Sequence, residues 1–254
     1  MKYVLLSLIS LLVAGVACAR TYSISGRVTD YNGLPVDSCS VMLFNPDFNP
    51  AIVTESDADG FYRLDSVPEG RYAAIAAIRL KEYPRMQQVP PEDMKLEFWA
   101  WNVVLDRNLD LNIRYGKLEL YGTKAFYEYG GRQELLIYTR PMSVTKAVHF
   151  ADYADKSAME RNTSVTVAPR FMEFRVYVDG RPIEILSVQH LSLPNTNGNS
   201  MNDDCYLIQT TLPENSNSNP EKPREIRVVG HNKEYDEWGE SVYYLEIPQY
   251  SKIK

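Results

Sequence analysis

Turn signals recur roughly every eight to twelve residues in the first third of the chain, with short alternating segments between them. The stretch SDADGFYRLDSVPEGRY, residues 56–72, contains an Asp-Gly turn and a Pro-Glu-Gly turn. Residues 61–65 between these turns alternate in parity, as expected for a strand with one buried face. We interpret the two acids and the glycine at 57–60 as a turn and not as a calcium loop, because the further ligands of such a loop are missing. This spacing is typical of an antiparallel β-sandwich.

The pattern changes at residues 81–94, where Pro84, Pro90 and Pro91 cannot continue a sheet. We interpret 83–94 as a linker between two separately folding domains, 20–82 and 95–254. Apolar residues at three- and four-residue steps predict one helix or two short ones within 142–160. Strands are predicted beyond the linker at 96–105, 110–122, 133–142, 163–168, 174–191, 205–212, 224–230 and 241–247. The fold class is therefore mainly all-β, with an immunoglobulin-like sandwich in the second domain that carries the helical insertion and whose topology stays open.

The first domain also carries a family resemblance. SGRVTDYNGLPVDSCSVML, followed by TESDADGFYRLDSVPEGRYAAIAA, resembles the carboxypeptidase regulatory-like domain, a transthyretin-like seven-stranded β-sandwich. The resemblance covers residues 22–80, and Cys39 stands where the family pattern has a small residue. It implies a module that accompanies surface enzymes, transporters and adhesins and is not itself catalytic.

The N-terminus predicts export. Residues 1–19 combine a lysine, an apolar run and the small-residue site Ala17-Cys18-Ala19, which is typical of a signal peptide. The apolar run is too short for a spanning helix. Cleavage after Ala19 would release a secreted or periplasmic protein, and lipidation of Cys18 would anchor it to the envelope instead. We expect the free form, and the anchor is the only membrane contact that the sequence suggests.

Charge and cysteine content limit the partners and the covalent chemistry. The net charge is −6 and no basic stripe is present, so a nucleic-acid partner is not expected. Apart from Cys18 the chain has Cys39 and Cys205. Cys39 shares its parity with apolar neighbours, which favours two buried free thiols over a disulfide between the halves of the chain.

Catalytic motifs are nearly absent from the sequence. The three histidines are far apart, so no metal site or cofactor is predicted. Ser143 and Lys146 form an S-x-x-K pattern without its usual companion motifs, and we expect Ser143 to be a helix N-cap. The acid pairs at 203–204 and 236–237 are expected to be surface charges. The Asn-rich loops at 194–204 and 213–223 are expected to be solvated, and no catalytic residue is assigned.

The tryptophans are the remaining candidates for a binding site. Alternation places Trp99 and Trp101 on one face of a strand, while Trp238 lies in a polar turn. We expect Trp99 and Trp101 to fill a sandwich core, while Trp238, with its charged neighbours, stays open between the two roles; exposed tryptophans would stack on sugar rings. The sequence thus predicts an exported, non-enzymatic surface or periplasmic protein for binding, adhesion or assembly, with a cell-surface protein or glycan as partner. The alternatives are a glycan-binding accessory protein and a hydrolase with an unfamiliar site.

Overall fold

The computed structural model describes residues 20–128, 134–150, 153, 155, 157, 164–194, 202–211 and 222–246. The predicted signal peptide with Cys18, and most of both Asn-rich loops, lie outside these residues. Among the residues that are described, no helix is long and apolar enough to span a membrane.

The N-terminal sandwich consists of two sheets. Their orders are β4-β1-β7, with β8 also pairing with β1, and β3-β2-β5-β6. The strands are β1 (Thr21–Thr29), β2 (Ser40–Phe44), β3 (Pro50–Glu55), β4 (Phe61–Pro68), β5 (Gly70–Ile78), β6 (Phe98–Leu105), β7 (Leu109–Asp110) and β8 (Ile113–Arg114). The predicted turn at Asp59-Gly60 is present, because Asp57 accepts hydrogen bonds from the backbone N–H groups of Asp59 and Phe61.

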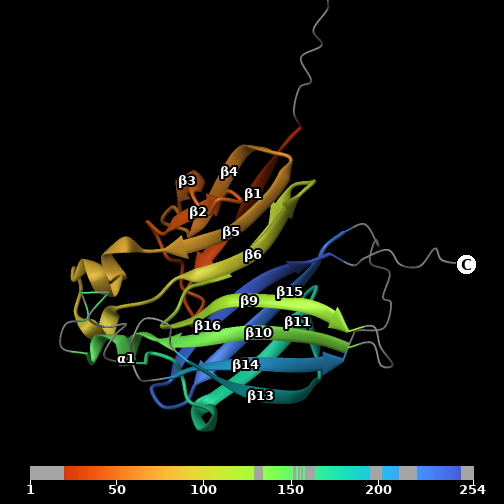
Figure 1. Ribbon diagram of the computed structural model, residues 1–254. Coiled ribbons are helices and arrows are strands. Elements are labelled where there is room, and N and C mark those ends of the chain that lie inside the picture. Colours follow the sequence, from red (N-terminus) through yellow and green to blue (C-terminus); the bar gives the residue numbers. More distant parts are fainter. Residues whose placement is uncertain are drawn as a thin grey trace, which may run out of the picture.

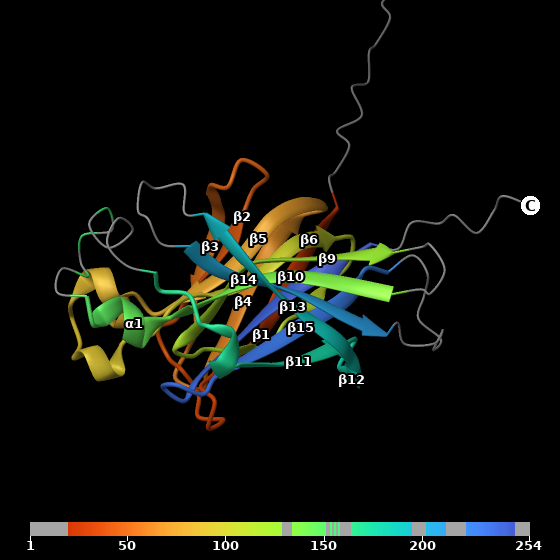
Figure 2. The ribbon, with the colours of Figure 1, turned by 60° about the horizontal axis from the view of Figure 1, so that its bottom comes forward.

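The C-terminal sandwich packs the sheet β13-β14-β10-β9 on β12-β11-β15-β16, and Figure 2 shows the first of these sheets. Its strands are β9 (Leu118–Glu128), β10 (Glu134–Ser143), β11 (Met172–Val178), β12 (Arg181–Ile183), β13 (Ile185–Pro194), β14 (Asn202–Thr211), β15 (Arg224–Asn232) and β16 (Glu237–Leu245). The short helices are α1 (Val144–Val148) and the 3-10 turns η1 (Leu80–Glu82), η2 (Pro84–Met86), η3 (Pro91–Asp93) and η4 (Pro169–Phe171). Helix α1 confirms a helix at the start of 142–160, and most of the rest of that segment lies outside the described residues. In 164–168, the described part of the strand predicted at 163–168, the strand pairing is one bridge, between Met142 and Thr166.

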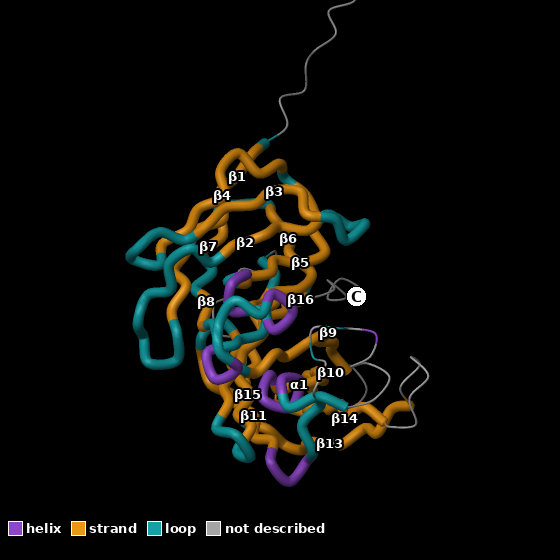
Figure 3. The backbone as a smooth tube through the Cα atoms, turned by 90° about the vertical axis from the view of Figure 1, so that its left-hand side faces the viewer, coloured by secondary structure: helices purple, strands orange, loops and turns teal. Residues whose placement is uncertain are grey.

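One eight-stranded sheet runs through both sandwiches, because β16 pairs in parallel with β6 over residues 241–243 and 99–101. Figures 1 and 3 show the two sandwiches stacked on this shared sheet. Buried side chains of β5 and β6 on one face join the core under β1 and β4. Buried side chains of β15 and β11 on the other face join the core under β9 and β10. The mainly β, two-sandwich architecture is thus as predicted, but strands β6–β8, from beyond the predicted linker, complete the first sandwich.

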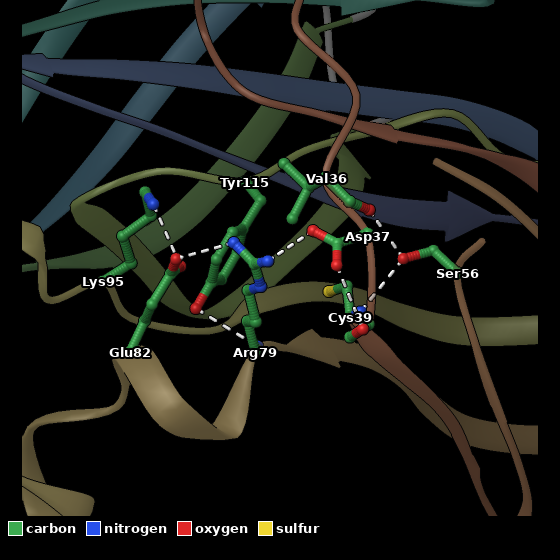
Figure 4. Close-up of polar contacts among 9 residues, drawn as sticks. Val36, Asp37, Cys39, Ser56, Arg79, Glu82, Lys95 and Tyr115 are labelled. Atoms are coloured by element: carbon green, nitrogen blue, oxygen red, sulfur yellow. Dashed lines mark hydrogen bonds and ion pairs between the residues drawn. The ribbon is translucent and has the colours of Figure 1, made fainter. Parts of the chain in front are cut away.

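The residues on either side of the predicted linker 83–94 are hydrogen-bonded to each other. The Glu82 carboxylate accepts from Arg79 Nη1 and Lys95 Nζ at 2.9 Å each, and Lys95 N donates to the Glu82 carbonyl oxygen. Figure 4 shows that Arg79 also bridges to Asp37 and that its backbone N–H meets the Tyr115 hydroxyl. Met94 packs with Val144 of α1 in a small separate core. Residues 83–94 are therefore a loop that is fixed at both ends.

Cys39 and Cys205 are both buried and free. This confirms the prediction of two buried free thiols in place of a disulfide. Cys39 lies in the first core, and Cys205 lies on β14 beside the hydroxyl of Tyr138. Burial raises the pKa of the Cys39 thiol to about 12, so this thiol stays protonated at neutral pH.

Candidate functional site: an aromatic groove at the junction

Trp99 and Trp101 lie on the same face of β6 and stack on each other, with ring centroids 4.9 Å apart. Phe48, from the β2–β3 loop, lies parallel to both rings, and Tyr121 of β9 meets both edge-on. Trp99 is buried, whereas Trp101 is only partly buried. The structure therefore divides a pair that the sequence treats alike: Trp99 belongs to a core cluster and Trp101 stands at its edge. A ligand-binding role for either ring stays a prediction.

The indole N–H of Trp99 has a partner within the protein. It donates to a Glu119 carboxylate oxygen at 2.7 Å. Glu119 is buried, and its burial together with the nearby charge of Glu97 raises its pKa well above the usual value. The hydrogen bond between Trp99 and Glu119 therefore satisfies the indole N–H inside the protein. We call Phe48, Trp99, Trp101 and Tyr121 the aromatic cluster.

At Asn102 the regular alternation of side chains along β6 is interrupted. Trp101 packs in the aromatic cluster and Val103 in the first core, although they are two residues apart. Asn102 between them has φ 54°, a left-handed conformation that Asn tolerates better than most residues. Its amide donates to the Tyr244 carbonyl oxygen at 2.7 Å, which ties β6 to β16.

A groove of 690 Å³ lies beside this irregularity, between the shared sheet and β9 and β10. Five of its lining residues are aromatic and come from strands of both sandwiches. The lining consists of Tyr72, Ala73, Trp101, Asn102, Tyr121, Gly122, Thr123, Lys124, Tyr138, Arg140 and Tyr243. We call this site the aromatic groove.

Two buried N–H groups of the aromatic groove have no hydrogen-bond partner among the described residues, Trp101 Nε1 and Arg140 Nε. Arg140 is otherwise well held, because Asp203 accepts from its Nη1 at 3.3 Å and its Cζ lies 5.1 Å from the Tyr121 ring centroid. Buried donors are almost always paired in folded proteins. These two N–H groups are therefore exceptions to that rule among the described residues.

Trp238 lies elsewhere, at a second pocket of 610 Å³ between the β1–β2 turn and β11. Its ring stacks on His231 at 4.0 Å, and the Arg175 guanidinium lies 5.4 Å from its centroid. Tyr31 also lines this pocket, and its buried hydroxyl has no partner among the described residues. The three tryptophans named from the sequence thus do not form one site.

The S-x-x-K residues have structural contacts. Ser143 is fully buried and caps α1, accepting from Lys146 N at 3.1 Å, which confirms the predicted N-cap. Lys146 Nζ donates to the Thr166 carbonyl oxygen and not to the Ser143 hydroxyl. In this arrangement the amine is not positioned as a base for the serine.

The acid pairs are not simple surface charges, and that expectation was wrong for Glu237. Its side chain is fully buried and accepts from Thr145 N at 2.9 Å and Asn232 Nδ2 at 2.8 Å, whereas Asp236 is exposed. Asp203 and Asp204 pair with Arg140 and His190. Within the described part of the chain, no three His, Cys, Asp or Glu side chains are grouped to hold a metal ion.

Sequence reasoning missed most of the aromatic groove. Tyr121, Tyr138, Tyr243 and Arg140 are on three different strands, and only the sheet pairings bring them to Trp101. The available signal was the high tyrosine content, 18 residues, which does not show where the rings converge.

Comparison with known families supports the first sandwich. The family model of the carboxypeptidase regulatory-like domain matches residues 23–94, which confirms the resemblance found in the sequence. The match covers less than a third of the chain. No curated protein matches the sequence.

Solved structures of three bacterial major pilins are similar over most of the chain. BcpA of Bacillus cereus is 12% identical, with 89% of this chain and 69% of that chain covered and a TM-score of 0.27. SpaD of Corynebacterium diphtheriae is 9% identical, with 88% and 64% covered and a TM-score of 0.26. RrgB of Streptococcus pneumoniae is 12% identical, with 84% and 48% covered and a TM-score of 0.24.

Proposed function

We propose that this protein is an exported, non-enzymatic binding protein of the cell envelope that holds a saccharide in the aromatic groove. The observation that carries the proposal is the convergence of five aromatic side chains from both sandwiches on one 690 Å³ groove. Aromatic rings offer flat apolar faces, and Tyr and Trp add a polar group at the edge. A sugar ring has the matching combination of apolar C–H faces and hydroxyl groups. The groove volume is also within the usual range for small-ligand sites, about 300–1,000 Å³.

The groove is built on rigid elements, which favours binding. Its lining residues lie in or beside β5, β6, β9, β10 and β16, and β16 is hydrogen-bonded to β6. Side chains on strands are held more precisely than side chains on loops, so less conformational freedom is lost when a ligand binds. Export is supported by the signal-like residues 1–19, and a surface role by the kind of module that residues 23–94 match.

Binding to an oligosaccharide array followed by titration calorimetry tests the proposal. The Tyr138→Ala variant removes a ring from the groove wall, and we expect it to weaken binding about tenfold, equivalent to about 1.4 kcal/mol. The Trp238→Phe variant changes the second pocket and serves as the matched control, with affinity unchanged. Binding that Trp238→Phe abolishes and Tyr138→Ala leaves intact would move the site to the second pocket, and no saccharide binding at all would refute the proposal.

A further inference from the structure

Strand β13 forms a free edge of the sheet β13-β14-β10-β9. It pairs with β14 and with no other strand among the described residues, and the pairing runs without interruption from Ser187 to Pro194. Figure 1 shows β13 on the side of the molecule that faces away from the first sandwich. An edge strand presents backbone N–H and C=O groups that no neighbouring strand uses, so a further strand can pair there.

β13 differs from the other free edges of this protein in its side chains. Natural proteins protect sheet edges with charged side chains, with proline, with bulges or by keeping the strand short. The other described edge strands, β3, β4, β7, β8, β9 and β12, each contain at least one Lys, Arg, Asp or Glu. β13 contains none of these. Its bulge lies at its start, between Ile185 and Ser187, and its proline is its last residue, so the stretch Ser187–Leu193 has neither.

β13 also carries more exposed apolar surface than any other strand in the described part of the chain. Leu186, Val188 and Leu193 are 42%, 45% and 42% exposed, whereas each of the other described strands has at most one exposed large apolar side chain. Side chains alternate along a strand, so Val188 and Leu193 point to opposite faces of the sheet. A strand that pairs with β13 would therefore cover apolar surface on both faces.

The partner that fits this edge is a strand without charge, and β13 of a second copy is such a strand. Two copies of this chain, each with a formal net charge of −6, repel each other over most of their surfaces. When β13 lies against β13, no Lys, Arg, Asp or Glu of one strand lies opposite another, and apolar side chains meet apolar side chains. An antiparallel pair of identical strands has a two-fold axis, the commonest symmetry of protein dimers.

We propose that β13 pairs antiparallel with β13 of a second copy, so that their two sheets join into one continuous sheet. The pairing leaves the aromatic groove accessible, because the groove lies along β9 and β10 and no residue of β13 lines it. The dimer therefore carries two open grooves, and a ligand that spans both gains avidity. The pairing itself does not depend on saccharide binding.

Sedimentation equilibrium of the full-length exported protein measures the pairing, and we expect a monomer–dimer equilibrium. Val188→Lys places one positive charge on each side of the two-fold axis, so it should weaken the dimer at least about tenfold. Val53→Lys is the matched control, because Val53 is 54% exposed on the edge strand β3, which already contains Pro50 and Glu55. It should leave the dimer unchanged. Both valines are exposed, and thermal melts by circular dichroism check that both variants fold.

Hydrogen exchange locates the contact independently of any variant. Alternate N–H groups of an antiparallel edge strand point away from its neighbour. In β13 these groups should exchange more slowly as the protein concentration rises, and the corresponding groups of β3 should not change. Calorimetry with a saccharide that fills one groove should give the same affinity per groove for the wild type and for Val188→Lys.

Three results would overturn the pairing. The first is a protein that remains monomeric up to about 1 mM. The second is a dimer that Val53→Lys weakens as much as Val188→Lys, which would place the contact outside β13. The third is slow exchange at β13 in a monomer, which would mean that another part of the same chain covers the edge. None of these results bears on saccharide binding, which calorimetry measures separately.

Discussion

The two sandwiches use one sheet in opposite ways. Over β2, β5 and β6, the face that carries Ile75 and Val103 is covered by the sheet of β1 and β4. Over β11 and β15, the other face is covered by β9 and β10. Between these two regions the covering sheet changes from one face of the shared sheet to the other. There, the face of β6 that carries Trp101 lies against β9 and β10 at the aromatic groove. The comparison teaches that the groove belongs to the junction, so neither sandwich alone contains it.

Dividing the chain at the predicted linker is the strongest way to break this arrangement. Nine of the 20 buried residues of the first core lie beyond residue 94, including Phe98, Leu111 and Val242. We therefore propose that the first sandwich ends near residue 116 and not at 82. A fragment of residues 20–94 should show no cooperative thermal unfolding by circular dichroism, whereas residues 20–116 regain β6–β8 and should show more strand signal. A cooperative transition in the shorter fragment would contradict this boundary.

How far the sequence predicts this arrangement depends on the range of the contacts. Local signals predict most strands, the Asp59-Gly60 turn and the Ser143 cap, because parity, turn chemistry and capping act over a few residues. The parallel pairing of β16 with β6 joins residues about 140 positions apart and has no local signal. The groove depends on that pairing, so the sequence points to Trp101 but not to the residues that surround it.

The buried charge at the junction is expected to give the largest effect of any single substitution. The Glu240 side chain is fully buried and accepts from Arg114 N at 3.1 Å and Arg114 Nε at 2.8 Å, and it also pairs with Arg227. Without Glu240, the mostly buried Arg227 keeps Glu225 as an ion-pair partner, and Arg114 is partly exposed to solvent. The full loss of a buried partner costs about 3–5 kcal/mol, so Glu240→Ala should lower the free energy of unfolding in urea titrations by about 3 kcal/mol, the lower end of that range.

The matched control for Glu240 is an exposed ion pair. Arg63 and Asp65 pair at 2.6 Å with both side chains about half exposed. Asp65→Ala should therefore cost less than about 1 kcal/mol. Equal losses in the two variants would mean that Glu240 does not hold the junction together.

Ser143→Ala tests the next smaller contribution, at the far end of β10. The hydroxyl accepts from Lys146 N, and Ala offers no acceptor to the first turn of α1. The variant should lose about 0.5–2 kcal/mol of unfolding free energy, the usual range for a lost cap. Saccharide binding should be unchanged, because Ser143 is not part of the groove lining. Loss of binding without loss of stability would argue against a purely structural serine.

Glu119→Gln makes the smallest chemical change and sharpens the comparison between the two tryptophans. Gln keeps an acceptor for Trp99 Nε1 and removes the titration of a buried carboxyl. Because burial and Glu97 raise the pKa of Glu119 above its ordinary value of 4.5, folding favours the protonated form. The stability that this group contributes is complete below the unfolded pKa and is lost as the pH rises toward the folded pKa.

The unfolding free energy of Glu119→Gln minus that of the wild type should therefore rise as the pH is raised above 4.5, the ordinary pKa of a glutamate. Asp37, Asp106 and Glu173, whose pKa values are lowered mainly by neighbouring Arg or Lys groups, act in the opposite direction. Their contributions are the same in both proteins and cancel in the difference. Trp99 keeps its acceptor at every pH, so aromatic packing is held constant as well. A difference in unfolding free energy that does not change with pH would mean that Glu119 titrates as an ordinary carboxyl. The Glu119 side chain beside Trp99 would then not be held in its protonated form by folding.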